Sequence, residues 1–184
     1  MPIDIQPTLE NADVILTPLK EQDFEALYKV ASDPKIWEQH PNKDRWQRDV
    51  FANFFQGAIE SKGAFLIIDK KTGEIAGSTR FYNYEEKDRS VLIGYTFYAT
   101  KFWGKGLNLA AKHLMLDHVF PKVDKVYFHI GATNLRSQIA IERLGAKKVA
   151  EETVAYYGET PKLNFVYEIT TATRRQPSAA SPVS

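Results

Sequence analysis

The sequence contains no cysteine among its 184 residues. This absence excludes disulfide bonds, thiolate nucleophiles and cysteine-ligated zinc sites, and it suits a reducing compartment. No apolar run approaches the roughly 18–20 residues that a membrane-spanning helix needs. Residues 1–9 include the acidic Asp4 and lack the apolar segment of a secretory signal. We therefore expect a cytoplasmic protein with no membrane partner and no metal site.

A charge excess of either sign is also missing. Lysine and arginine total 24 and aspartate and glutamate total 23, so the net charge is +1. Without a basic field, nucleic acid is not an expected partner. The length and the 43% hydrophobic content are typical of one globular domain, which we place at residues 1–170. Residues 171–184, rich in Pro, Ser and Ala, are expected to form a disordered tail.

Hydrophobic periodicity predicts a mixed α/β domain with one central sheet, preceded by a loose segment at residues 1–12. The expected elements are strand 14–16, a helix that begins at Thr17-Pro18 and ends at Asp33-Pro34, helix 45–61, strands 64–69, 74–84 and 91–98, helix 106–120, strand 126–130, helix 137–144, and strands 147–157 and 164–170.

Residues 102–109, Phe-Trp-Gly-Lys-Gly-Leu-Asn-Leu, follow a predicted strand and begin a predicted helix. Glycines let backbone N–H groups turn toward one point, and a helix N-terminus adds unpaired donors and partial positive charge, so the segment suits a phosphate or pyrophosphate. A glycine turn without a ligand is the simplest alternative. A Rossmann loop is excluded because Leu109 replaces the third glycine and no acidic residue follows Ile130-Gly131. A Walker A loop is excluded because Gly-Lys-Ser/Thr is missing.

The same segment resembles the pyrophosphate loop of the GNAT acetyltransferases, Gln/Arg-x-x-Gly-x-Gly/Ala, which we align with residues 103–108. Trp103 and Asn108 depart from the general pattern but resemble the RimJ/RimL-type branch, where Phe-Trp-Gly-Lys-Gly and a following Asn are familiar. Residues 134–146 resemble the family's Asn-x-x-Ser-x-x-Ala segment, and Ile93–Phe97 resembles the strand before the loop. The resemblance covers residues 14–170. It implies a GNAT fold, with a mixed, mostly antiparallel sheet of about six or seven strands flanked by about four helices.

The resemblance also implies that acetyl-CoA enters a gap between the strand that ends at Tyr98 and the strand that ends at Ile130. The Tyr98 N–H would polarise the thioester carbonyl. Lys105 either adds charge near the phosphates or is solvated, and Asn134 binds the pantetheine arm, caps a helix, or does both. The residues expected to contact coenzyme A are Phe97, Tyr98, Trp103, Gly104, Lys105, Gly106, Leu107, Asn108, Leu109, Asn134 and Ser137.

For the chemistry, the resemblance implies direct attack by an amine in a ternary complex, with two proton transfers. Many GNAT enzymes protonate the thiolate with a tyrosine seven residues after the Asn, where this sequence has Ile141. We therefore expect Ser137 to replace it, beside Tyr98, as the residues that act on the thioester. The alternative for Ser137 is a hydroxyl that satisfies backbone donors at a helix start.

The general base stays open, because Leu92 occupies a position where the family often has glutamate. The candidates are Glu85, Glu86, Asp88, His129 and His40, a water chain, or an amine that arrives neutral.

The acceptor is expected to be a protein N-terminus or a small-molecule amine, with Trp37, His40 and Trp46 lining its site. Because Leu92 and Ile141 replace the usual carboxylate and phenol, a non-catalytic acyl-CoA-binding module is the alternative function. Either would be a monomer or a homodimer.

Overall fold

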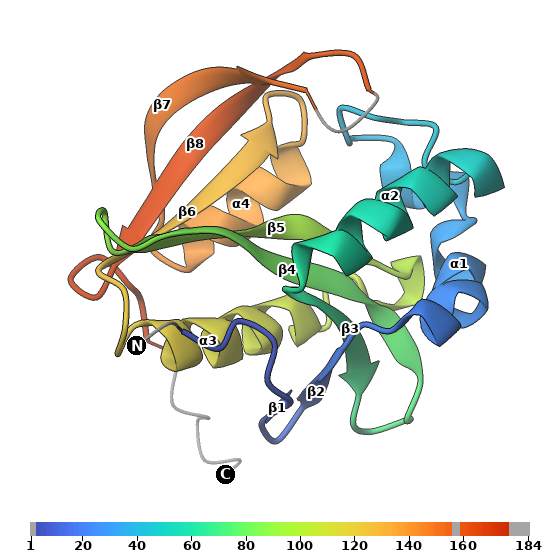
Figure 1. The fold of residues 1–184 in the computed structure, drawn as a ribbon, viewed down its shortest axis with the longest axis horizontal. Helices are drawn as coiled ribbons and strands as arrows, with labels where there is room; N and C mark the ends of the chain where they lie inside the picture. Colours follow the sequence, from blue (N-terminus) through green and yellow to red (C-terminus); the bar gives the residue numbers. More distant parts are fainter. Residues whose placement is uncertain (1–2, 156–158, 177–184) are drawn as a thin grey trace, which may run out of the picture.

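The computed structural model describes residues 3–155 and 159–176. These form one eight-stranded sheet in the order β1-β2-β3-β4-β5-β6-β8-β7 (Figure 1). The strands are β1 (Leu9–Glu10), β2 (Val14–Pro18), β3 (Ala64–Asp69), β4 (Ile75–Glu85), β5 (Ser90–Tyr98), β6 (Lys125–Gly131), β7 (Lys147–Val154) and β8 (Lys162–Thr170). The helices are α1 (Phe24–Ala31), α2 (Arg48–Ser61), α3 (Leu107–Val119) and α4 (Leu135–Arg143), with short 3-10 turns at Glu21–Asp23, Pro34–Trp37 and Thr100–Phe102.

The mixed, mostly antiparallel sheet and the four helices of the described residues confirm the expected fold class. The sheet has one strand more than expected, because Leu9 and Glu10 pair with Leu16 and Ile15 inside the segment predicted to be loose. The strand predicted at residues 147–157 corresponds to β7. Its described part ends at Val154, and residues 156–158 lie outside the described residues.

The predicted helix start at Thr17-Pro18 is wrong. Both residues belong to β2, where Thr17 pairs with Leu66 and Pro18 with Phe65. A proline at this position removes no ladder bond, because the pairing of β1 with β2 already ends at Leu16. The expected end of that first helix is confirmed, since α1 stops at Ala31.

The predicted start of the second helix, at residue 45, is also too early. The helix begins at Arg48, and Arg45 instead turns inward to form a buried ion pair with Glu159, with 2.9 Å between Nη2 and Oε2.

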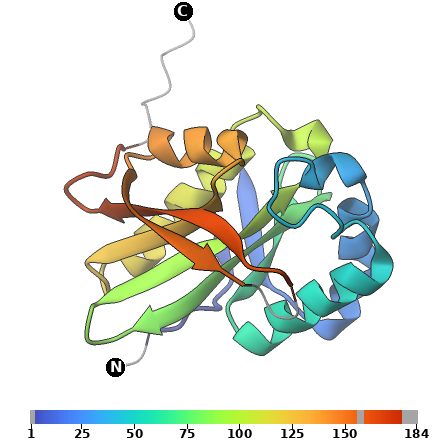
Figure 2. The same ribbon diagram turned by 90° about the horizontal axis from the view of Figure 1, so that it is seen from above.

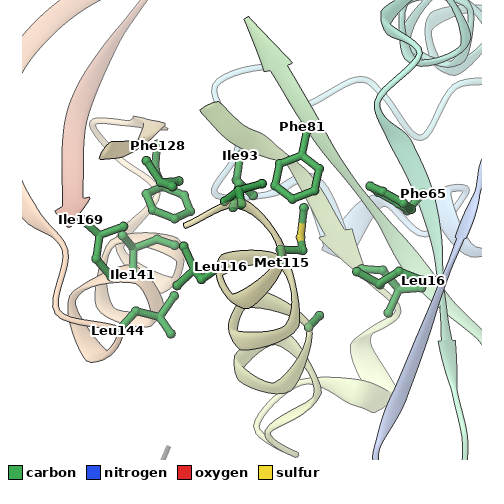
Figure 3. Packing of buried hydrophobic residues seen from close by; sticks show 14 of the residues in the cluster. Leu16, Phe65, Phe81, Ile93, Met115, Leu116, Phe128, Ile141, Leu144 and Ile169 are labelled. Atoms are coloured by element: carbon green, nitrogen blue, oxygen red, sulfur yellow. The ribbon is translucent and has the colours of Figure 1, made fainter. Parts of the chain in front are cut away.

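Helices cover both faces of the sheet (Figure 2), and an apolar core lies on each face. Alternation along β3 separates them: Phe65 and Ile67 belong to the core under α3 and α4, whereas Ala64 and Leu66 belong to the core under α1 and α2. Figure 3 shows the first core, in which Met115 and Leu116 of α3 project toward side chains of the sheet such as Phe81 and Ile93. The helices are therefore fixed to the sheet by burial, and so is the loop that precedes α3.

The parallel ladder between β5 and β6 is short. Its Cα partners are Ser90 with Lys125, Val91 with Val126 and Leu92 with Tyr127. Beyond them β5 continues to pair with β4 on one side, and β6 continues to pair with β8 on the other. The two strands therefore separate at the centre of the sheet.

A β-bulge lies where β5 leaves β6. The pairs Arg80–Gly94 and Ser78–Phe97 leave Tyr95 and Thr96 of β5 opposite the single residue Thr79 of β4. Tyr95 has a φ of 52°, an uncommon value for a residue other than glycine. A bulge bends its strand and increases the local twist, so it accounts for the divergence of β5 from β6.

The first part of the segment expected to form a tail, residues 171–176, contacts the domain. Arg174 forms an ion pair with Asp117 at 2.7 Å and donates a hydrogen bond to the backbone oxygen of His113, while the Arg175 N–H donates to the Leu144 oxygen. Residues 177–184 lie outside the described residues, so the disorder expected from residue 171 stays a prediction. In the described ranges no helix is both long and apolar enough to cross a membrane.

Candidate active site

Two cavities meet where β5 and β6 separate. The larger, about 770 Å³, is lined by the end of β5, the turn before α3 and one side of α4; we call it the loop cavity. The smaller, about 510 Å³, is lined by β4 to β8 and the segment before α2; we call it the strand cavity. Thr96, Asn108, Ser137 and Ala140 line both. A ligand in one cavity therefore reaches a ligand in the other beside these residues.

The turn before α3 is built on two glycines in the left-handed region, Gly104 with φ 72° and Gly106 with φ 79°. A Cβ on either glycine would meet nothing within 4 Å, so open space lies over this backbone. The first turn of α3 begins at Leu107 and has N–H groups without intrahelical partners. Unpaired donors, the helix dipole and open space together make a site for an anion such as a pyrophosphate.

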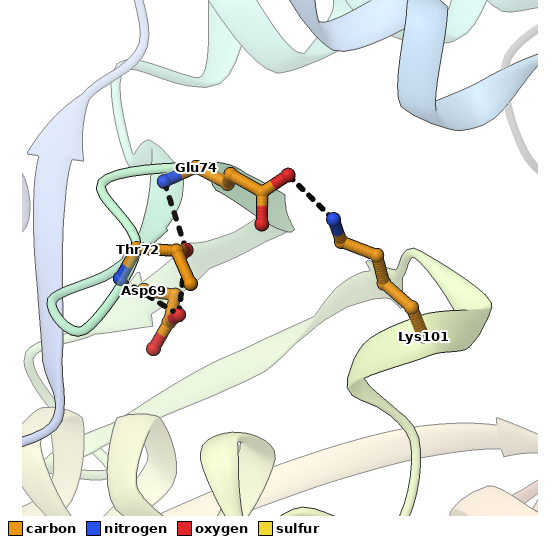
Figure 4. Close-up of polar contacts among 4 residues, drawn as sticks. All are labelled: Asp69, Thr72, Glu74 and Lys101. Carbon is orange, nitrogen blue, oxygen red and sulfur yellow. Dashed lines mark hydrogen bonds and ion pairs between the residues drawn. The ribbon is translucent and has the colours of Figure 1, made fainter.

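These glycines also correct the alignment of the loop pattern. If Gly104 and Gly106 are the two glycines of Gln/Arg-x-x-Gly-x-Gly, then Lys101 occupies the first position and Trp103 the third. The Lys101 ammonium does not line the loop cavity; it contacts the Glu74 carboxylate at the turn between β3 and β4 (Figure 4). This hydrogen bond lowers the pKa of Glu74. Lys101 thus holds the loop against a neighbouring turn.

Most of the residues expected to contact coenzyme A lie together. Those that line the loop cavity are Phe97, Tyr98, Trp103, Gly104, Gly106, Leu107, Asn108, Leu109 and Ser137. Asn134 lines the strand cavity only, and Lys105 is exposed and lines neither cavity. Arg136 and Arg143, which the sequence analysis did not single out, supply positive charge to the loop cavity. The Arg136 guanidinium stacks 3.7 Å from the centre of the Trp103 ring.

The backbone N–H of Tyr98 is directed toward the gap between β5 and β6. The Ala99 N–H donates to the Ala76 oxygen of β4 at 2.8 Å. Because alternate residues of a strand turn their N–H groups to opposite edges, the Tyr98 N–H points to the other edge, toward the gap beside β6. The Tyr98 side chain is buried, and burial raises the pKa of its phenol. Tyr98 therefore offers the gap a backbone donor rather than an acidic side chain.

Ser137 stands at the junction of the two cavities, in the first turn of α4. Asn134 is the N-cap of this helix, and its Oδ1 accepts a hydrogen bond from the Ser137 N–H at 3.4 Å. The capping role foreseen for Asn134 is present, and the cap holds the backbone of Ser137 at the helix start.

Of the three residues expected around the acceptor, the structure places only His40 at a cavity. Trp37 is fully buried and its indole N–H donates to the Ala31 oxygen at 2.8 Å, so it is a core residue. Trp46 is 38% exposed and lines neither cavity. Burial, aided by the charges of Arg45 and Arg136, lowers the pKa of His40 to about 3, so its ring is neutral at pH 7.

The candidate bases also differ in whether they line a cavity. Glu85 and Glu86 are exposed, and Asp88 forms an ion pair with Lys125 at 2.8 Å; none of the three lines a cavity. His129 lines the strand cavity, 3.8 Å from Glu152, and burial lowers its pKa.

Lys112 was missed altogether. It lies in α3 on the same side as Met115, Leu116 and Val119, is 2% exposed, and lines the strand cavity. Its Nζ donates to the hydroxyls of Thr96 at 3.0 Å and Thr79 at 3.3 Å. Burial lowers the pKa of Lys112 to about 7. A signal was present in the sequence, because a lysine at helical spacing within an apolar stripe is unusual.

Comparison with protein families gives the decisive match: the acetyltransferase (GNAT) domain matches residues 13–147. The chain belongs to the GNAT acetyltransferase family. Among solved structures, this GNAT chain is similar to a GCN5-related N-acetyltransferase from Brucella melitensis, with 18% identity, a TM-score of 0.77, and 91% of this chain and 80% of that chain covered.

Two further structures share the fold. One is the microcin C7 self-immunity acetyltransferase MccE in complex with acetyl-CoA and AMP, with 17% identity, a TM-score of 0.71, and coverage of 91% and 98%. The other, from Vibrio cholerae, is assigned as a ribosomal-protein-serine acetyltransferase, with 14% identity, a TM-score of 0.70, and coverage of 91% and 99%. At these identities the likeness is one of fold alone.

Proposed function

We propose that this protein is an N-acetyltransferase that moves the acetyl group of acetyl-CoA to a primary amine by direct attack in a ternary complex. The observation that carries the proposal is the meeting of two cavities at Thr96, Asn108 and Ser137. The loop cavity includes the anion-binding turn, and the strand cavity is lined by β4 to β8 and the segment before α2. Two substrates held in this way react as if in one molecule.

Acetyl-CoA fits the loop cavity by charge and by backbone direction. The N–H groups that follow Gly104 and Gly106 receive the pyrophosphate, and Arg136 supplies a cation beside them. The thioester then lies in the gap between β5 and β6. There the Tyr98 N–H donates to the carbonyl oxygen and stabilises the negative charge that develops on it during attack.

The amine enters from the strand cavity, and its lone pair attacks the carbonyl carbon. When the carbon–sulfur bond breaks, Ser137 donates its hydroxyl proton to the thiolate and regains a proton from water. The usual phenol has no counterpart here, because Ile141 is an apolar residue buried in the core. Ser137, in the first turn of α4, instead carries a hydroxyl and lines both cavities.

The acceptor is a protein N-terminus or a small-molecule amine. The Phe-Trp-Gly-Lys-Gly segment with Asn108 supports a RimJ/RimL-type assignment, and the fold shared with the Vibrio cholerae protein is compatible with it. The strand cavity is lined mainly by polar side chains, including Asn42, Asn83 and Asn164, which suits a polar acceptor.

Release of thiol from acetyl-CoA, measured with a thiol-reactive dye, tests the proposal. The protein has no cysteine and adds no background. We expect release with one class among N-terminal peptides, polyamines and aminoglycosides, and no release without an acceptor. Saturable binding of acetyl-CoA with silence across all three classes would favour a non-catalytic acyl-CoA-binding module.

A further inference from the structure

We propose that Lys112 is the proton acceptor of the acetyl transfer, and that the proton reaches it from the attacking amine through the hydroxyl of Thr96. The inference rests on the proposed function and supplies the base that the position of Leu92 leaves missing. It starts from a contact triangle, two of whose members, Thr96 and Lys112, line the strand cavity. Lys112 Nζ lies 3.0 Å from Thr96 Oγ1 and 3.3 Å from Thr79 Oγ1, and the two hydroxyls lie 2.9 Å apart.

The triangle sits where the two cavities join. Thr96 lines both cavities, whereas Lys112 lines the strand cavity and is 2% exposed. A group that takes a proton from the amine at the moment of attack must reach the junction. Thr96 does so directly, and Lys112 does so through Thr96. The β-bulge at Tyr95 and Thr96 turns this part of β5 from the regular ladder, so the same irregularity that opens the gap also places the hydroxyl.

No carboxylate neutralises Lys112 in the part of the chain that the structure describes. The charged and titratable groups that line the cavity with it are His40 and Arg45 before α2, Tyr82 on β4, Tyr95 on β5, His129 on β6, Glu152 on β7 and Lys162 on β8. Arg80 of β4 packs on the Tyr95 ring at 4.1 Å. A buried ammonium without a counter-ion is costly, so the neutral amine is favoured.

Burial lowers the pKa of Lys112 to about 7, which leaves a large share of the neutral form near neutral pH. The alternatives in the cavity are weaker bases. His40 has a pKa of about 3, and burial lowers the pKa of His129 below its ordinary 6.5. A general base works best when its pKa lies near the working pH, so Lys112 is suited to the role.

The proton balance closes without a further reagent. The amine nitrogen forms a bond to the carbonyl carbon and becomes positively charged. Its proton passes to Thr96 Oγ1 as the Thr96 proton passes to the lone pair of Lys112 Nζ. The carbon–sulfur bond then breaks with its electron pair on sulfur, which takes the Ser137 proton. Lys112 loses its proton to water, and water returns one to Ser137, so amide and free coenzyme A are the only products.

The experiment is the pH profile of kcat/KM for three variants beside the unaltered protein. Lys112→Met keeps the length of the side chain without its amine, and Thr96→Val keeps the shape without the hydroxyl. Lys122→Met makes the same change as the first variant at an exposed lysine that lines neither cavity. All four are first measured for acetyl-CoA binding, which we expect to be alike and which shows that the fold is intact.

We expect activity of the unaltered protein and of Lys122→Met to fall with a slope of one below pH about 7. Lys112→Met and Thr96→Val should lose roughly 10²–10⁴-fold in kcat and lose this limb of the profile, with KM for acetyl-CoA little changed. A purely structural role would leave the profile in place. Lys112→Met with the original kcat and profile would overturn the proposal.

A second measurement does not depend on turnover. Nitrogen-15 NMR of labelled lysine side chains, recorded against pH, should show one Nζ that titrates near pH 7 and is lost in Lys112→Met. Titration of Lys112 near 10.5, its ordinary value, would overturn the relay whatever the enzyme assay gives. If Lys112 titrates near 7 but no amine is acetylated, the proposed function is what fails.

Discussion

Leu92 and Tyr127 are the last Cα partners between β5 and β6, and past this pair the two strands separate. Both strands keep their ladders on their outer sides, so the gap costs no pairing elsewhere. The Tyr98 N–H turns into this gap, and Thr96 and Ser137 line both cavities that open from it. The proposed acetyl transfer therefore takes place where the β5–β6 ladder ends.

The anion-binding turn is tested by Gly106→Ala. An alanine in the left-handed region costs about 1–2 kcal/mol, and relief of that strain would rotate the N–H groups of the turn. We expect acetyl-CoA to bind about tenfold more weakly in calorimetry. Gly73→Ala is the matched control, because Gly73 has a φ of 75° and open space around it but lies in the turn between β3 and β4. Equal affinity in both variants would contradict the role of the turn.

Proton donation to the thiolate is tested by Ser137→Ala. We expect kcat to fall by roughly 10²-fold, because a positioned proton donor contributes about this much, while KM for acetyl-CoA stays within a few-fold. Ser32→Ala, at an exposed serine after α1 whose hydroxyl donates to the Lys29 oxygen, should leave kcat unchanged. Unchanged turnover in Ser137→Ala would remove this residue from the mechanism.

The burial of Lys112 also predicts a pH dependence of stability. Its pKa is 10.5 in the unfolded chain and about 7 in the folded protein, so the unfolded chain binds more protons between these values. The free energy of unfolding contributed by this group therefore rises with pH across that window, by up to roughly 1.4 kcal/mol per unit. Below pH 7 Lys112 is protonated in both the folded and the unfolded protein. The full cost of the buried charge is then present, and the free energy of unfolding contributed by this group no longer changes with pH.

Urea denaturation between pH 6 and 10 measures this effect. Lys112→Met should be more stable than the unaltered protein at pH 6, and the difference should shrink as the pH rises toward 10. The Lys122→Met control should show a constant difference. A difference between Lys112→Met and the unaltered protein that does not change with pH would show that Lys112 is charged when folded.

Arg174 is predicted to stabilise the domain. Its side chain is 7% exposed, forms an ion pair with Asp117 and donates to the backbone oxygen of His113. Asp117 is largely exposed, so the pair itself contributes little, and most of the effect comes from lost packing. We expect Arg174→Ala to lower the free energy of unfolding by about 1–2 kcal/mol. Arg175→Ala, at the exposed neighbour, should stay within about 0.5 kcal/mol, and equal effects would contradict the packing role.

Most of the fold could be predicted because its signals are local. In the described residues, apolar periodicity predicted the four α-helices and the strands β2 to β8, and Asp33-Pro34 ended α1 as expected. β1 was missed because a two-residue strand, Leu9–Glu10, has no period to detect. Thr17-Pro18 was assigned to a helix because a hydroxyl followed by proline also suits a helix start, and only the register with β3 decides between the two.

In the candidate site, too, the features formed by one continuous segment could be predicted, and those formed by distant segments could not. The turn with Gly104 and Gly106 is continuous in sequence and was recognised. The triangle of Thr79, Thr96 and Lys112 joins β4, β5 and α3, so its chemistry depends on a bulge that no local pattern reveals. Likewise, aromatic content could not show which of the expected acceptor residues would face a cavity.

The most direct test of acetyl transfer to an amine follows the carbonyl carbon of acetyl-CoA. Acetyl-CoA labelled with carbon-13 at that carbon is incubated with the protein and the acceptor class that releases thiol, and NMR follows the label. We predict that the thioester signal is replaced by an amide signal on the acceptor, and that this conversion is lost when the acceptor amine is blocked. A label that stays in the thioester, or moves to water as free acetate, would contradict transfer to an amine at this site.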